Sequence, residues 1–92
     1  MSKKLEEIKK RLKEVRESTG MSQIDFAIHC GLKGQVITNL ENGRQYPKFE
    51  LIEKIAEKYP EYEDWILTGK EFPEAGQISP MTKDTAEKLK TS

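Results

Sequence analysis

The stretch from Met21 to Pro47, which reads MSQIDFAIHCGLKGQVITNLENGRQYP, decides the fold of this 92-residue chain. Ser22, followed three positions later by Asp25, forms a capping-box pattern that predicts the start of a helix over residues 23–30. Gly31 predicts its end, because glycine adopts the left-handed backbone conformation of a helix stop without strain. The first part of the stretch therefore predicts one short, well-delimited helix.

The second part of the stretch predicts another helix, over residues 34–42. Two helices that cross closely need a small residue at the crossing, a glycine in the turn and apolar residues that face each other. The positions that meet these needs are Phe26, Ala27, Cys30, Gly31, Ile37 and Leu40. Their combined spacing is typical of a helix-turn-helix, and the alternative is an unrelated helical hairpin that matches by chance.

The rest of the chain has the periodicity of further helices. An apolar stripe predicts an amphipathic helix over residues 3–19, and its members are Leu5, Ile8, Leu12 and Val15. Helices are also expected over 49–59 and 62–68, and Ser79-Pro80 predicts a sixth over 80–90 after an exposed connector. No segment alternates as a strand does. We expect an all-α fold, a compact five-helix domain with a C-terminal extension able to form a short sixth helix.

Composition limits the class of protein. Sixteen basic and sixteen acidic residues cancel, yet residues 1–20 carry a net charge of +3 and residues 48–72 one of −3. Such a domain could orient itself on a polyanion, although two ordinary solvated helix faces would give the same pattern. One cysteine closes no intrachain disulfide, and no signal peptide or membrane-length apolar run is visible. We therefore expect a soluble protein in a reducing compartment, and its small size favours a dimer.

Residues 21–47 resemble, without gaps, the helix-turn-helix of the lambda-repressor and Cro type, the XRE family. The segments around this stretch are similar to the rest of that five-helix domain, so the resemblance covers about 70 of the 92 residues. It implies a DNA-binding domain over 1–72, with the helix-turn-helix at about 22–43, and leaves 73–92 as a linker and tail.

The resemblance also implies a function. Members of the family bind a two-fold symmetric operator as homodimers, with the second helix of the motif in the major groove, and repress or activate the adjacent promoter. The expected protein is a transcription regulator of phage or prophage repressor type, cytoplasmic and nucleoid-associated in a bacterium or a phage-infected cell. Its partners would be double-stranded DNA and a second copy of the chain, and it would have no membrane partner.

Polar side chains share one face of the helix over 34–42. Glutamine and asparagine can bind adenine with two hydrogen bonds, and threonine offers a hydroxyl or a methyl for thymine. The expected base-reading residues are Gln35, Thr38 and Asn39. Groups near the helix ends should hold the DNA backbone, and the expected phosphate-binding residues are Gln23, Lys33, Asn42, Gly43, Arg44 and Lys48.

Two departures from the family pattern stand out. Lys33 and Gly34 occupy positions where the family usually has a serine or threonine cap and a polar side chain, so the usual partner of Gln23 is missing. Ile24 and Ile28 replace charged residues. They form either a partner site or a pair covered by the N-terminal helix or the tail.

Protein contacts are expected from a few apolar side chains, namely Ile24, Ile28, Trp65, Met81 and Leu89. The helix over 80–90 would be marginal alone, and we consider both docking on a partner subunit and disorder. His29 and Cys30 point about 100° apart on a helix and lack further ligands, so no metal, cofactor or catalytic site is expected and the chain is not expected to be an enzyme. Two alternative functions remain: an antitoxin-type autoregulator whose tail binds a toxin, and a protein-interaction module that has lost DNA binding.

Overall fold

The computed structural model describes residues 2–91, and it describes side chains for residues 2–85. The chain is helical, as expected, and the described part holds no strand beyond an isolated antiparallel bridge between Phe72 and Gln77. In order, the elements are α1 (Lys3–Thr19), α2 (Gln23–His29), α3 (Val36–Glu41), α4 (Phe49–Lys58), the 3-10 turn η1 (Pro60–Tyr62), α5 (Glu63–Thr68), the 3-10 turn η2 (Pro73–Ala75) and α6 (Pro80–Thr91). The predicted number and order of the α-helices are confirmed.

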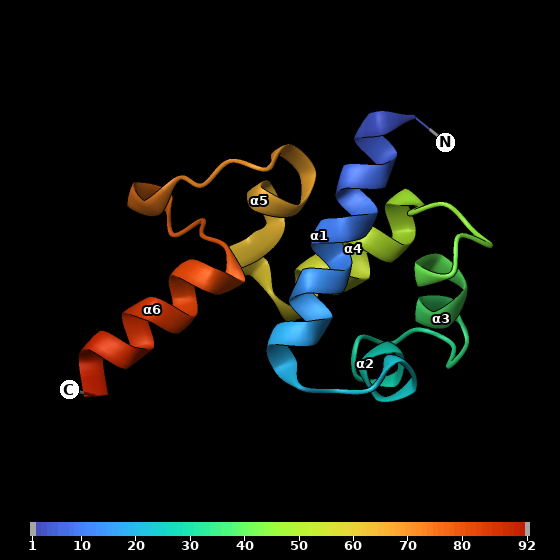
Figure 1. Cartoon of the computed structure of the whole chain (residues 1–92), viewed down its shortest axis with the longest axis horizontal. Helices are drawn as coiled ribbons and strands as arrows, with labels where there is room; N and C mark the ends of the chain where they lie inside the picture. Colours follow the sequence, from blue (N-terminus) through green and yellow to red (C-terminus); the bar gives the residue numbers. More distant parts are fainter. Residues whose placement is uncertain (1, 92) are drawn as a thin grey trace.

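One hydrophobic core joins the first five helices. The apolar stripe of α1 shares this core with buried residues of the other four helices, and α1 crosses α4 with α3 and α5 on its two sides (Figure 1). The buried members are Ile8, Leu12, Val15, Phe26, Ala27, Cys30, Ile37, Leu40, Leu51, Ile52, Ile55, Tyr62 and Ile66. Six positions predicted the helix-turn-helix. Five of them are buried in this core, namely Phe26, Ala27, Cys30, Ile37 and Leu40. The sixth, Gly31, lies in the turn between the two helices.

The turn between α2 and α3 explains how their crossing is fixed. Ser22 caps α2, because its Oγ accepts a hydrogen bond from the backbone N–H of Asp25 at 3.1 Å. Gly31 has a φ of +76°, a conformation that side chains rarely adopt, so this position requires glycine. The Leu32 N–H then donates to the carbonyl of Ala27 at 2.8 Å and closes the end of α2.

The second helix of the motif begins later than predicted. Residues 34 and 35 form a turn, and α3 starts at Val36, whose N–H donates to the carbonyl of Lys33 at 3.1 Å. Gln35 occupies the N-cap position but gives no side-chain cap, and Gly34 has no side chain with which to cap. The start of α3 is therefore held by backbone bonds alone.

The segment after α5 is tied more firmly than an exposed connector would be. Residues 70–76 are exposed, as predicted, but Ser79 and Pro80 are buried. The Gln77 side chain accepts from the Asp64 N–H at 2.8 Å and donates to the Pro60 carbonyl at 2.9 Å. These bonds fix the start of α6 against η1 and α5.

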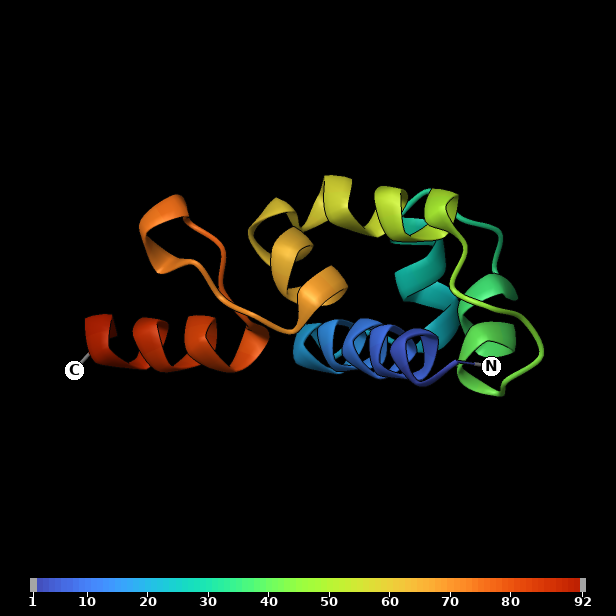
Figure 2. The same ribbon diagram turned by 90° about the horizontal axis from the view of Figure 1, so that it is seen from above.

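Helix α6 leaves the body of the domain. Its first turn is held by an ion pair between Lys83 and Glu61, and the Lys83 ammonium lies 5.7 Å from the centre of the Tyr62 ring. Beyond that turn the helix extends away from the other helices, at the end of the molecule opposite α3 (Figures 1 and 2).

Candidate nucleic-acid interface

Helix α3 lies at one end of the molecule, with its apolar side on the core and its other side free. Ile37 and Leu40 are buried against α1, α2 and α4, whereas Gln35 and Asn42 are exposed and Asn39 is half-buried. The side-chain amides of Gln35 and Asn39 form no hydrogen bond with any other residue that the structure describes. Two amides able to donate and accept are therefore available on this face for an external ligand.

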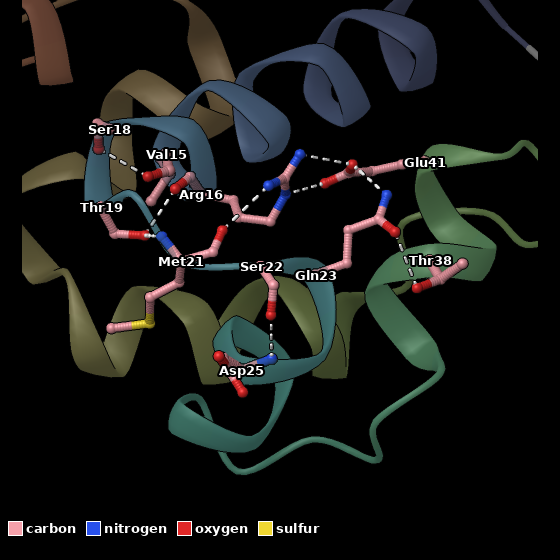
Figure 3. Close-up of polar contacts among 10 residues, drawn as sticks. All are labelled: Val15, Arg16, Ser18, Thr19, Met21, Ser22, Gln23, Asp25, Thr38 and Glu41. Carbon is pink, nitrogen blue, oxygen red and sulfur yellow. Dashed lines mark hydrogen bonds and ion pairs between the residues drawn. The ribbon is translucent and has the colours of Figure 1, made fainter.

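A polar network connects the three helices beneath this face (Figure 3). The Arg16 guanidinium of α1 forms two hydrogen bonds with the Glu41 carboxylate of α3, from Nε to Oε2 at 2.8 Å and from Nη2 to Oε1 at 3.0 Å. Glu41 Oε1 also accepts from Gln23 Nε2 of α2 at 2.8 Å. The Glu41 side chain is only 5% exposed, and its bonds raise the pKa of Arg16 above the ordinary value.

Thr38 completes this network, which changes its predicted role. Its Oγ1 donates to Gln23 Oε1 at 3.1 Å, so the hydroxyl proton expected to reach a base is directed to α2 instead. The same bond supplies the partner that Gln23 lacks because Gly34 has no side chain. The Gln23 amide therefore accepts a hydrogen bond at Oε1 and donates one from Nε2. Only the second hydrogen on Nε2 remains available to donate to a phosphate.

The end of α3 and the loop after it bring several predicted phosphate-binding residues together. Asn42, Gly43, Arg44 and Lys48 are all exposed. The N–H of Arg44 donates to the carbonyl of Asn39 at 2.8 Å, which turns the loop back over the helix. The loop thus presents its polar groups at the C-terminal end of α3.

Lys33 and Lys48, which are 15 positions apart in the sequence, line one groove. It has a volume of about 290 Å³ and lies between the α2–α3 turn and the start of α4. Lys54 lies in the same groove and donates to the carbonyl of Gly31 at 3.2 Å. Sequence reasoning missed Lys54, because its position on α4 gives no sign that the helix passes the α2–α3 turn.

Ile24 and Ile28 remain uncovered. Their side chains are 46% and 63% exposed, so the prediction that α1 or the tail covers them is wrong for the part of the chain that the structure describes. Helix α1 packs against the opposite side of α2, where Phe26 and Ala27 are buried, and α6 lies at the far end of the molecule.

The other residues predicted to contact a protein partner, Trp65, Met81 and Leu89, differ in how far the structure exposes or describes them. Trp65 is half-buried and packs against the core, so only part of its ring could meet a partner. Met81 is 79% exposed at the start of α6. Leu89 lies outside the residues whose side chains are described.

Cys30 is a core residue, whereas His29 is exposed at the end of α2. Cys30 is buried, as predicted, and burial raises the pKa of its thiol to about 11. The His29 ring lies 6.2 Å from the Tyr59 ring. Among the described residues, no group of three His, Cys, Asp or Glu side chains could hold a metal ion. None of the described helices has the length and apolar character that crossing a membrane requires.

Comparison with known proteins agrees with this geometry. The family model of a helix-turn-helix domain matches residues 9–71, about two thirds of the chain, from the middle of α1 to just beyond α5. A search of curated proteins gave no match.

Proposed function

The chain belongs to the helix-turn-helix domain family, and on this basis we propose that it is a sequence-specific regulator of transcription that binds double-stranded DNA. The observation that carries the proposal is the pair of unbonded amides of Gln35 and Asn39 on the outer face of α3. On a helix in the major groove, such amides can each form two hydrogen bonds with an adenine edge.

The remaining polar groups divide into two roles in this proposal. Thr38 and Glu41 hold Gln23 at the start of α2, where its free Nε2 hydrogen can donate to a phosphate. The groove with Lys33, Lys48 and Lys54 holds the phosphates beside the α2–α3 turn, and Asn42, Gly43 and Arg44 hold those at the other end of α3. These groups set the register from which the two amides read sequence.

We further propose a homodimer that binds a two-fold symmetric operator, in the manner of a phage or prophage repressor. A single α3 of six residues can contact only a few base pairs, so a specific site calls for a second copy. Trp65 of α5 and the exposed Met81 of α6 are candidate contacts between the copies, because these two helices lie away from α3 (Figure 1).

Selection of bound duplexes from a random DNA pool at about 0.15 M salt tests this function, since exposed charges then act over only about 8 Å. A two-fold symmetric motif supports a dimeric reader of DNA. A single unsymmetric half-site would support DNA reading but contradict the dimer. If nothing is enriched while circular dichroism shows a folded protein, the proposal is wrong.

The exposed Ile24 and Ile28 favour a second candidate, a protein-interaction module built on the same fold. Replacing both by serine, which adds no charge beside the proposed phosphate contacts of Gln23 and Lys33, separates the two functions, since neither side chain is needed for the core. A DNA reader keeps most of its operator affinity in this variant, whereas an interaction module loses its partner. The projecting α6 similarly leaves room for an antitoxin whose tail binds a toxin, and co-purification of a second small protein would favour that alternative.

A further inference from the structure

A second basic surface lies beside α3, on the N-terminal half of α1. Lys3, Lys9, Lys10 and Lys13 line a groove of about 450 Å³ together with three glutamates, one of which is Glu41 of α3. The groove therefore runs between two helices that are far apart in the sequence.

The charges in this groove do not balance. Glu41 is bound by Arg16 and Gln23, and Glu6 lies 3.4 Å from the Lys9 ammonium. Only Glu7 is left to oppose Lys3, Lys10 and Lys13. These three lysines are exposed and have no hydrogen bond or ion pair with any residue that the structure describes. The groove is therefore electropositive, although the whole chain has no net charge.

The groove is continuous with the loop after α3. Lys9 Nζ lies 4.0 Å from the position that a Cβ atom on Gly43 would take, so its ammonium lies against the backbone of this loop. In Figure 2 the N-terminal half of α1 and helix α3 lie at the same end of the molecule, and Glu41 of α3 lines the groove with the lysines of α1. A path of positive and polar groups thus leads from Arg44 across Gly43 to the lysines of α1.

We propose that Lys3, Lys10 and Lys13 bind backbone phosphates of the same duplex that α3 reads. The inference rests on the proposed function and adds α1 to its DNA interface. The three lysines are spaced seven and three residues apart along the helix, so they span about 15 Å of its length. Along that distance a duplex presents several phosphates, and each lysine that neutralises one releases a condensed counterion.

The opposite side of α1 provides a matched control. Lys4 lies in another groove, with Arg11 and Lys70, that faces α5 instead of α3; Lys3 and Glu7 line both grooves, whereas Lys10 and Lys13 line only the one beside α3. Lys58 at the end of α4 is also exposed. Replacing Lys4, Lys58 and Lys70 by glutamine removes as much charge as replacing Lys3, Lys10 and Lys13, but leaves the groove beside α3 intact.

The experiment measures the affinity of the full chain for a duplex recovered from the random pool, at salt concentrations from about 0.05 to about 0.2 M. We expect the Lys3→Gln/Lys10→Gln/Lys13→Gln variant to have a slope of log affinity against log salt that is shallower by about 5 than that of the wild type, because a dimer on its operator loses six phosphate contacts at about 0.9 each. Its base preference should be unchanged. The control variant should keep the wild-type slope.

Three results would overturn the inference. The first is an equal change of slope in both variants, which would indicate only a general effect of charge. The second is a change of base preference in the α1 variant, because phosphate contacts carry no sequence information. The third is a wild-type chain that binds no duplex, which would overturn the proposed function as well; the first two results leave that function intact. Far-UV circular dichroism confirms that each variant is folded.

Discussion

The Thr38 hydroxyl donates to Oε1 of Gln23 at 3.1 Å and so links the two helices of the helix-turn-helix. Gln23 in turn donates to Glu41 at 2.8 Å, and Glu41 binds Arg16. Helix α3 is therefore fixed to α1 and α2 by polar contacts as well as by the core. Because Gly34 has no side chain, this arrangement supplies from α3 itself the partner that Gln23 needs.

Thr38→Val should lower both the free energy of unfolding and the affinity for DNA. The valine leaves Gln23 Oε1 without its donor at a half-buried position, which costs about 0.5–1.5 kcal/mol. Urea denaturation and fluorescence anisotropy on the selected duplex measure the two effects. Thr38→Ser is the matched control, because serine keeps the hydroxyl and should behave like the wild type. If serine loses as much DNA affinity as valine, the methyl of Thr38 matters and the hydroxyl does not.

Arg16→Met should destabilise the domain strongly. The change leaves the Glu41 carboxylate, 5% exposed, without its charged partner, and breaking such a buried pair costs about 3–5 kcal/mol. The free energy of unfolding of Arg16→Lys should lie between those of Arg16→Met and the wild type, since lysine keeps the charge but cannot form the bidentate hydrogen bonds with Glu41. Urea denaturation midpoints give the order. A loss below about 1 kcal/mol for Arg16→Met would mean that the pair behaves as a surface ion pair.

The fold could be predicted from local patterns in the sequence. Ser22, Gly31 and the spacing of the apolar residues fixed the limits of α1 and α2 to within one residue, because caps, stops and amphipathic faces are local signals. The start of α3 was predicted two residues early. At that point Gly34 offers no cap, and the backbone alone determines where the helix begins.

The site could be predicted only in part. The outward positions of Gln35 and Asn39 follow from helical periodicity; Gln35 is exposed and Asn39 is half-buried, and their base-reading role stays a prediction. The bonds of Thr38 and Glu41 to Gln23 could not be predicted, because they depend on how α2 and α3 cross. The sequence left open whether Ile24 and Ile28 are exposed or covered, because the apolar pattern cannot show whether another element reaches that side of α2; among the described residues none covers them.

Cys30 should be almost unreactive toward iodoacetamide in the folded protein. Burial raises the pKa of its thiol from 9.0 to about 11, so at pH 8 only about a thousandth is the reactive thiolate. Mass spectrometry of samples quenched over time gives the rate. The same reaction in urea provides the unfolded reference and should be far faster. Equal rates in the two samples would contradict the buried position of this side chain.

Glu71 should titrate at a pH lower than that of an ordinary glutamate. Hydrogen bonds from the Thr82 side chain and the Ser79 backbone lower its pKa below 4.5. The pKa of Glu71 is lower in the folded chain than in the unfolded chain. Its contribution to the stability of the start of α6 is therefore complete above about pH 4.5, and it is lost as the pH falls through the lowered pKa.

The amide NMR signal of Ser79 provides the measurement of that titration. Its chemical shift should follow a midpoint below 4.5, and Glu71→Gln should remove the transition. A midpoint at or above 4.5 would show that Glu71 is not bound to the start of α6.

The assignment of α3 as the reading helix is tested most directly by repeating the random-pool selection with Gln35→Ala. We predict that the variant recovers the wild-type motif with preference lost at one base position in each half-site, and that its affinity for the wild-type operator falls by about 1–3 kcal/mol. Arg44→Ala provides the comparison, since it should weaken binding to all sequences alike. An unchanged motif and affinity for Gln35→Ala would contradict the account.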